Sequence, residues 1–337
     1  MDSNSPSTIY TTFGIPASAD VYTEFATPAA LVAAIEAGTL QDKPLFVLGG
    51  GSNVIFSKHF AGQVVKMANK GIRLVDEPTA EGCVLVNAAA GECWDGFVRH
   101  CIAQGWYGVE NMAEIPGTVG AAPVQNVGAY GVEAKDVVEW VHAIDILTGR
   151  ERRFSNEECG FGYRTSVFKR ELKGRYVVVD VTFRLRTVFE PDLRYAGIAN
   201  ALSAAGIAEP TAQQVADTVA AIRWEKLPRP EQKGSAGSFF KNPVVGHEQM
   251  ESLRRAYPDI VAHAVDGGFK LSAGWLIDRA GWKGRTMGRC GVYEKQALVL
   301  VNLGGCTGSE VVALADTIAD DIAARFGVTL EREAIIL

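Results

Sequence analysis

The chain has 337 residues, 47% of them hydrophobic and 21% charged, which is ordinary for a folded protein too long to bury a single hydrophobic core. Its net charge of −6 disfavours a general nucleic-acid surface, and no stretch reaches the ~20 apolar residues that a membrane helix requires. A chain of this length is expected to form two or three domains. Residues 1–12 lack the basic start and apolar middle of a secretion signal, so we expect a cytoplasmic protein.

The first half of the chain predicts alternating helices and strands. Residues 29–37 have the pattern of a short helix, and apolar stretches at 45–48 and 54–56 flank a glycine loop. A dinucleotide fingerprint would need a glycine where Val54 stands and a helix after it, so a Rossmann fold is disfavoured. A phosphate loop with Gly-Lys-Ser/Thr is absent as well. Strands are predicted over residues 83–89, 137–147 and 176–185, and a helix over residues 94–104.

A pair of prolines divides the second half of the chain. A helix opens at Pro210 and continues to about Lys226, and Leu227-Pro228-Arg229-Pro230 ends it at our preferred domain boundary. Beyond this boundary the pattern predicts helices over residues 248–256, 271–280 and 309–326, a strand over 297–302 and a strand-like tail over 328–337.

The cysteines are widely spaced, at positions 83, 93, 101, 159, 290 and 306. No Cys-x-x-Cys pair or Cys/His cluster occurs, so the sequence indicates neither a metal site nor a disulfide framework. We therefore expect reduced thiols that mainly fill packing space.

Two glycine-rich loops are suited to an anion, because glycines let backbone N–H groups converge without obstruction by side chains. The first loop consists of Gly49, Gly50, Gly51, Ser52 and Asn53. The candidate residues of the second are Pro116, Gly117, Thr118, Gly120, Ala121, Gln125, Asn126, Gly128, Tyr130 and Gly131. Either loop alone would be read as a tight turn, but together they favour a cradle for a diphosphate.

Two further segments carry side chains that could bind a ligand or take part in catalysis. Gly162-Tyr163-Arg164 places a guanidinium, which can grip a carboxylate with two hydrogen bonds, beside an aromatic ring. The segment 236–243 offers the hydroxyl of Ser238, the ammonium of Lys241 and the amide of Asn242. A serine beside a glycine is on its own ordinary turn chemistry, and a lone arginine is ordinarily a surface residue.

In this order, the four segments resemble the UDP-N-acetylenolpyruvoylglucosamine reductase family, and the resemblance covers residues 13–337. It implies an α+β protein with a two-subdomain FAD-binding fold of the vanillyl-alcohol-oxidase (PCMH) type and a C-terminal α+β substrate-binding domain. We expect FAD-binding subdomains at residues 1–70 and 71–215, the second completed by the tail 327–337, and a substrate-binding domain at 222–326.

The resemblance also implies the ligands and the reaction. NADPH would reduce noncovalently bound FAD, and a hydride would then pass to UDP-N-acetylglucosamine enolpyruvate to give UDP-N-acetylmuramate for peptidoglycan. We expect a monomer without nucleic-acid or membrane partners.

By the same resemblance, Ser238 donates a proton to the substrate, while Arg164 and Glu333 stabilise the negative charge that develops toward the substrate carboxylate. Glu333 would help if burial kept it protonated. In the type I branch, Tyr195 on a mobile loop closes on the nucleotide sugar, and Lys226 contacts its diphosphate. The same pocket would include Tyr163, Asn242, Lys270, Lys283 and Gln296.

Without the resemblance, these residues have plainer interpretations: Glu333 as a solvated carboxylate, Tyr195 as a packed aromatic and Lys226 as a cation at a helix end. Two other functions also stay open. An oxidase of the same flavin fold that uses oxygen would explain the glycine loops but not Tyr195, Lys226 or the serine turn. A non-catalytic nucleotide-binding module would explain the loops without Ser238 or Glu333.

Overall fold

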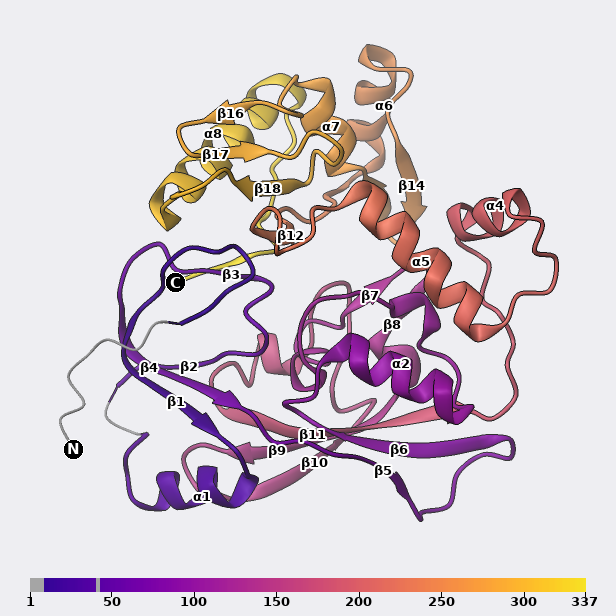
Figure 1. Ribbon diagram of the computed structural model, residues 1–337. Helices are drawn as coiled ribbons and strands as arrows, with labels where there is room; N and C mark the ends of the chain where they lie inside the picture. The colour runs from indigo at the N-terminus through magenta and orange to yellow at the C-terminus, as the bar shows by residue number, and fades with distance from the viewer. Residues whose placement is uncertain (1–8, 41–42) are drawn as a thin grey trace. The chain divides into compact units, whose positions relative to one another are not determined.

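The structure, a computed structural model, describes residues 9–40 and 43–337 (Figure 1). This part of the chain divides into two compact units. The first comprises Ala19–Gly50 and Ala61–Arg223, and the second comprises residues 9–18, Gly51–Phe60 and Trp224–Leu337. The finer division into two subdomains and a substrate-binding domain stays a prediction.

Most of the polar N-terminal stretch, in which no secretion signal was found, lies outside the described residues. Among the residues that are described, no helix is both long enough and apolar enough to span a bilayer.

A five-stranded antiparallel sheet with the order β10-β9-β11-β6-β5 forms the centre of the first unit. Its strands are β5 (Ile72–Val75), β6 (Cys83–Ala89), β9 (Val138–Asp145), β10 (Glu151–Ser155) and β11 (Tyr176–Arg186). The central strand β11 is rich in valine, which suits a pleated surface packed on its neighbours. Val181 and Phe183 of this strand are fully buried. The predicted strands 83–89, 137–147 and 176–185 are confirmed, with small shifts at some ends.

Helix α2 (Trp94–Gln104) packs on this sheet and has the bounds that the sequence predicts (Figure 1). The ring centroids of Trp94 and Phe97 lie 6.0 and 4.6 Å from that of Phe183 in β11. The helix ends at Gly105, whose φ of 75° is a left-handed conformation that glycine adopts without steric penalty. These aromatic contacts form part of the largest buried cluster of the unit.

A three-stranded sheet with the order β1-β4-β2 packs with helix α1 (Pro28–Glu36). Its strands are β1 (Ala19–Phe25), β2 (Leu45–Val47) and β4 (Phe60–Met67). Thr27 caps α1 by accepting a hydrogen bond from the Ala30 N–H, and Leu31 and Ile35 form its buried face. The predicted helix at 29–37 is thereby confirmed.

The rest of the first unit consists of short elements and helices outside the two sheets. They are β7 (Gly128–Ala129), β8 (Val132–Glu133), α3 (Ala134–Val137), α4 (Ala196–Ala204), most of α5 (Ala212–Lys226), and 3₁₀ turns at Glu110–Met112, Val119–Ala121 and Val167–Lys169. Helix α5 ends at the predicted residue, whereas α4 was not predicted.

Small antiparallel sheets and helices build the second unit, with strand orders β12-β18-β17-β16 and β13-β15-β14. The elements are β12 (Ser235–Ser238), β13 (Val244–Val245), α6 (His247–Ala256), β14 (Ala262–Val265), β15 (Gly268–Leu271), α7 (Ala273–Arg279), β16 (Thr286–Met287), β17 (Cys290–Val292), β18 (Val299–Asn302) and α8 (Gly308–Phe326). Helix α8 begins at a reciprocal capping box between Thr307 and Glu310 and ends at Gly327. Helix α7 begins later than predicted because Ser272 accepts a hydrogen bond from the Trp275 N–H and caps it.

Cys290 and Cys306 form a disulfide, so the expectation that all cysteines are reduced thiols is wrong for this pair. Strand β17 and the turn after β18 bring their Cα atoms to 5.8 Å, which a disulfide can span. The remaining cysteines, at positions 83, 93, 101 and 159, are free thiols. The pairing depends on how β17 and β18 align, which a spacing of 16 residues does not reveal.

The C-terminal segment is held by a short pairing instead of the predicted long strand. β19 (Ile335–Ile336) pairs in parallel with β3 (Val54–Ile55). The Leu337 carbonyl accepts hydrogen bonds from the N–H and the hydroxyl of Ser57 at 2.7 and 2.6 Å. The prediction of a strand over 328–337 is therefore wrong for most of its length, but the chain end is fixed within the second unit.

Candidate active site

The two glycine loops meet in the first unit. A Cβ atom on Gly49 would lie 2.8 Å from the Cβ of Ala121, and one on Gly50 would lie 2.9 Å from the Cα of Gly117. These distances leave no room for a side chain, so the close approach depends on glycine at both positions. The predicted loops thus form one surface from residues 49–50 and 117–121, while Gly51, Ser52 and Asn53 belong to the second unit.

The rest of the second loop folds around Asn126, which is fully buried. Its amide donates hydrogen bonds to the Glu133 carboxylate at 3.0 Å and to the Gly162 carbonyl at 3.1 Å. Its side-chain oxygen accepts a hydrogen bond from the Lys135 N–H at 2.9 Å. This predicted cofactor residue therefore ties the loop to the segment that carries Arg164.

A tight turn presents Tyr163 and Arg164. Gly162 and Thr165 exchange backbone hydrogen bonds across it, at 3.0 and 3.3 Å. The Arg164 guanidinium donates to the Gly128 carbonyl at 3.1 Å and lies 5.6 Å from the centroid of the Tyr163 ring. The prediction that this guanidinium stands beside an aromatic ring is confirmed.

These side chains line a cavity of about 430 Å³ within the first unit, a volume in the range of small-molecule sites. Tyr130, Tyr163 and Arg164, all predicted for the site, form part of its wall. Its other charged lining residues were not predicted: Glu133, Lys135, Asp136 and Arg194. Scattered charges in short elements give no pattern that a sequence reading could have used.

Ser238 ends β12 in the second unit and is exposed. The register of β12 against β18 shifts between Ser235 and Ser238, and Gly237 has a φ of 67° at this bulge. Phe239 and Phe240, which follow directly, are 0% and 1% exposed. The bulge therefore presents the serine hydroxyl on a strand whose next residues are anchored in the core.

Glu333 lies on the segment that pairs with the residues after Ser238. Its N–H donates to the Phe239 carbonyl at 2.8 Å, and its carbonyl accepts a hydrogen bond from the Asn53 amide at 3.2 Å. Ser238 and Glu333 are thus carried by neighbouring segments of one unit. Arg164 belongs to the first unit, and the approach of all three residues stays a prediction.

Tyr195 and Lys226 stand at helix ends. Tyr195 directly precedes α4 in the first unit and is 40% exposed, while Lys226 is the exposed last residue of α5. Both side chains are therefore accessible to a ligand.

The other predicted pocket residues lie in the second unit. The Asn242 side-chain oxygen accepts a hydrogen bond from the Ala273 N–H at the start of α7. Lys270 in β15 pairs with Val244 in β13. Lys283 forms an ion pair with Asp278 at 3.2 Å, and the Gln296 side chain accepts a hydrogen bond from the Leu298 N–H at 3.3 Å.

Arg223 is a site neighbour that the sequence did not indicate. Its Nε donates to the Glu114 carbonyl at 3.1 Å, and its guanidinium lies near the Tyr130 hydroxyl. Burial lowers the pKa of Arg223 and raises the pKa of Tyr130. The Tyr130 ring in turn meets the Tyr195 ring edge to face, with centroids 5.0 Å apart. No sequence pattern marks Arg223, since an arginine near a helix end is ordinarily a surface cation.

Among the described residues, no group of histidine, cysteine, aspartate or glutamate side chains could hold a metal ion.

Two family models match this chain. A family model described as "FAD binding domain" matches residues 19–155, and one described as "UDP-N-acetylenolpyruvoylglucosamine reductase, C-terminal domain" matches residues 229–337. The UDP-N-acetylenolpyruvoylglucosamine reductase of Azoarcus sp. (strain BH72) is 48% identical over 329 residues, which cover 97% of this chain and 94% of the relative. That of Paraburkholderia xenovorans (strain LB400) is 47% identical over 335 residues, covering 98% and 96%.

A solved structure shares the fold. The crystal structure of UDP-N-acetylenolpyruvylglucosamine reductase (MurB) from Thermus caldophilus superposes with a TM-score of 0.66 at 23% identity, covering 97% of this chain and 95% of the other.

The match to an FAD binding domain, followed by a matched C-terminal domain, defines the chain as an FAD-binding flavoprotein, and its mixture of helices and sheets confirms the predicted α+β class. Within that class, the chain belongs to the UDP-N-acetylenolpyruvoylglucosamine reductase family, as its motifs predicted.

Proposed function

We propose that the protein reduces UDP-N-acetylglucosamine enolpyruvate to UDP-N-acetylmuramate, a peptidoglycan precursor, with NADPH as hydride source and noncovalent FAD as carrier. The observation that carries the proposal is the exposed Ser238 hydroxyl on a segment paired with that of Glu333, in a chain 48% identical to a reductase of this name. An oxidase or a simple nucleotide-binding module has no use for that pair.

The residues present fit a bound FAD. Gly49, Gly50 and Gly117 form a surface without side chains, on which backbone N–H groups can approach a diphosphate. These glycines lie within the segment that matches the FAD binding domain. When bound, FAD supplies the hydride chemistry that no side chain offers.

The reaction saturates the double bond of the enol ether, so a hydride must reach the terminal carbon and a proton the carbon that bears the carboxylate. We assign the proton to the hydroxyl of Ser238. Serine is a poor acid in water, but it can protonate a strongly basic carbon when it is positioned against it. The bulge of β12 offers this hydroxyl to a ligand while Phe239 and Phe240 fix its backbone.

Arg164 and Glu333 are assigned to the charge that develops toward the substrate carboxylate. The planar guanidinium of Arg164 can donate two parallel hydrogen bonds to that carboxylate. Glu333 can assist when it carries a proton and donates it as a hydrogen bond, a state that burial beside a ligand favours. Fixed groups of this kind lower the barrier because they need not reorganise during the reaction.

The remaining residues are assigned to binding of the nucleotide sugar: Tyr163, Tyr195, Lys226, Asn242, Lys270, Lys283 and Gln296. The Lys283–Asp278 pair has side chains that are 36% and 53% exposed, so it contributes little and can be exchanged for a phosphate. We further propose that the protein acts as a monomer in the cytoplasm, where nucleotide sugars and NADPH are available. Light scattering that gives a mass near 36.1 kDa would support the monomer.

Anaerobic mixing of the purified holoprotein tests the proposal in two stages. NADPH should bleach the flavin absorbance, and subsequent addition of the enolpyruvyl nucleotide sugar should restore it. A protein without flavin would point to the nucleotide-binding module. Rapid reoxidation by oxygen, without a response to the nucleotide sugar, would point to the oxidase.

A further inference from the structure

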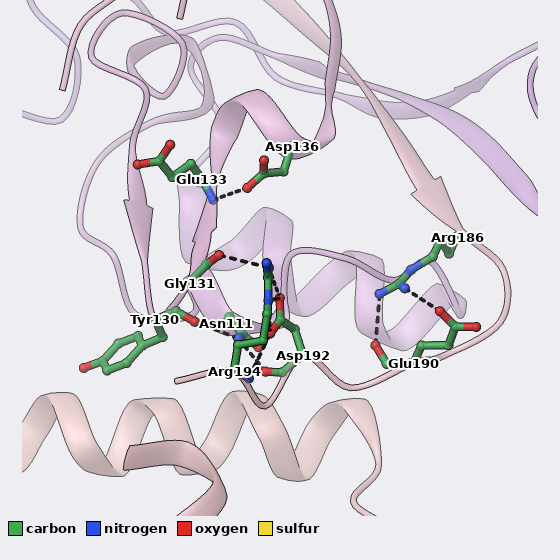
Figure 2. A network of polar contacts seen from close by, with 9 residues as sticks. All are labelled: Asn111, Tyr130, Gly131, Glu133, Asp136, Arg186, Glu190, Asp192 and Arg194. Atoms are coloured by element: carbon green, nitrogen blue, oxygen red, sulfur yellow. Dashed lines mark hydrogen bonds and ion pairs between the residues drawn. The ribbon is translucent and has the colours of Figure 1, made fainter. Parts of the chain in front are cut away.

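The segment that carries Tyr195 is fastened to the cavity wall by polar contacts that no part of the proposed chemistry uses (Figure 2). This segment, residues 187–195, connects β11 to α4. At its beginning, the Arg186 guanidinium donates to the carboxylate and the carbonyl of Glu190 at 2.9 and 3.0 Å. At its end, Asn111, Asp192 and Arg194 form a set of contacts that we call the loop anchor.

Asn111 bridges two segments with its amide group. It is 2% exposed, and its Nδ2 donates to the Tyr130 carbonyl at 3.0 Å and to the Asp192 carbonyl at 2.9 Å. An amide nitrogen has two hydrogens, so this bridge uses its full donor capacity. The Tyr130 and Asp192 backbones are therefore held at a fixed separation by one buried side chain.

Arg194 forms the second bridge between the same two segments. Its Nε donates to both oxygens of the Asp192 carboxylate at 3.0 Å, and a terminal nitrogen donates to the Gly131 carbonyl at 3.3 Å. Hydrogen bonding to Arg194 lowers the pKa of Asp192, so the pair is ionised at neutral pH. Arg194 also lines the cavity, directly before Tyr195 in the chain.

The two bridges hold the backbone beside Tyr130 to the backbone just before Tyr195, and the rings of these two tyrosines are in contact. Tyr130 and Tyr195 meet edge to face, at an interplanar angle of 87°. The Tyr130 backbone is held by the buried Asn111 amide, and its hydroxyl lies near the Arg223 guanidinium. The position of the Tyr195 ring against Tyr130, which lines the cavity, thus follows from where the loop anchor holds its backbone.

We propose that Asn111 and Arg194 are positioning residues that act through Tyr195, setting how it meets the nucleotide sugar. The inference rests on the proposed function for its ligand, but the geometry of the anchor is independent of the reaction. Loss of either bridge releases the 187–195 segment and weakens binding of the sugar without removing a group that touches it.

Five variants test this: the single variants Asn111→Asp, Arg194→Gln and Tyr195→Ala, and the two double variants that combine Asn111→Asp or Arg194→Gln with Tyr195→Ala. The Arg194 side chain is 75% exposed, so its replacement leaves folding intact even if a change at buried Asn111 does not. Asn156→Asp is the matched control, because the Asn156 amide also donates to two carbonyls, those of Lys135 and Val138, at 2.8 and 2.6 Å.

We expect Asn111→Asp and Arg194→Gln each to raise the KM for the enolpyruvyl nucleotide sugar about tenfold, with flavin content and kcat nearly unchanged. In the Tyr195→Ala background neither change should raise KM further, because residues that act through one group are not additive. Full additivity would overturn the inference, since Arg194 or Asn111 would then act directly or through the fold as a whole. An equal rise in KM with Asn156→Asp would overturn it as well.

Hydrogen exchange of the protein alone gives a second readout. The variants should exchange several-fold faster within residues 187–195 and unchanged in β11, whereas unaltered exchange in 187–195 would overturn the inference. This measurement needs no substrate, so it separates a failure of the anchor from a failure of the proposed reaction. The latter would appear as absent turnover in the unsubstituted protein.

Discussion

At the scale of single residues, backbone strain gathers in the segments assigned to the site. In the described part of the chain, the non-glycine residues with positive φ are Glu114, Asn126, Tyr130 and Arg164. Such conformations cost ~1–3 kcal/mol each and persist where surrounding contacts over-determine them. Asn126 and Arg164 show these contacts directly, through hydrogen bonds to Glu133 and Gly128. The strain therefore supports a functional role for this region.

Replacement of Ser238 separates the two stages of the proposed reaction. Ser238→Ala should leave bleaching of the flavin by NADPH nearly intact and should slow reduction of the enolpyruvyl nucleotide sugar by at least ~100-fold, the usual scale for general acid catalysis. Rapid-mixing absorbance of each stage measures both rates.

Ser235→Ala is the matched control, because Ser235 opens the same strand but is buried. It should leave both rates unchanged. Equal slowing of both stages in Ser238→Ala would reject the proton-donor assignment and indicate a general disturbance of the site.

The sequence predicted site residues correctly where the interacting residues are neighbours in the chain. Tyr163 and Arg164 follow each other in the chain, and the structure keeps their side chains together. Asn111 could not be found in this way, because its two partners lie 19 and 81 residues away. Its role depends on a chain path that only the folded protein creates.

At the scale of elements, the close contact between the two glycine loops requires a glycine at position 50. Gly50→Ala places a Cβ against the backbone of Gly117, which must move to relieve the overlap. Overpacking of this kind costs ~1–3 kcal/mol. We expect the purified variant to contain much less FAD, measured as the ratio of flavin to protein absorbance.

Gly246→Ala is the control for this change, because a Cβ at Gly246 would meet no atom within 4 Å. It should retain the flavin content of the unsubstituted protein. A full flavin content in Gly50→Ala would contradict the assignment of these loops to the cofactor.

The disulfide between β17 and the start of α8 can be tested by counting thiols. Under denaturing conditions without reductant, four thiols should react, those of Cys83, Cys93, Cys101 and Cys159. Cys306→Ala should lower the free energy of unfolding by about 3 kcal/mol, the value for a closed loop of this length. Reaction of all six cysteines in the unreduced protein would show that the bond does not form.

Elements with strong local signals were predicted well, and those set by distant pairing were not. Helix α2 and strand β6 have the predicted bounds because their apolar periodicity agrees with their burial. The tail has the composition of a strand throughout, yet its one regular strand is Ile335–Ile336, which pairs with β3, while Arg332 forms an isolated bridge with Phe240. Strand length there depends on the two residues that β3 offers, which lie far away in the sequence.

At the scale of the whole molecule, the proposed activity draws on both compact units. The glycine surface and Arg164 belong to the first unit, and Ser238 and Glu333 belong to the second. The family relatives match nearly the full length of the chain, so the match includes both units. We therefore predict that neither unit alone supports turnover.

The central claim is tested most directly by NADPH consumption in the purified, flavin-containing protein. The account predicts that rapid oxidation of NADPH begins only when UDP-N-acetylglucosamine enolpyruvate is added, with one UDP-N-acetylmuramate formed per NADPH consumed. NADPH oxidation that proceeds equally well without the nucleotide sugar, or that yields no reduced sugar product, would contradict it.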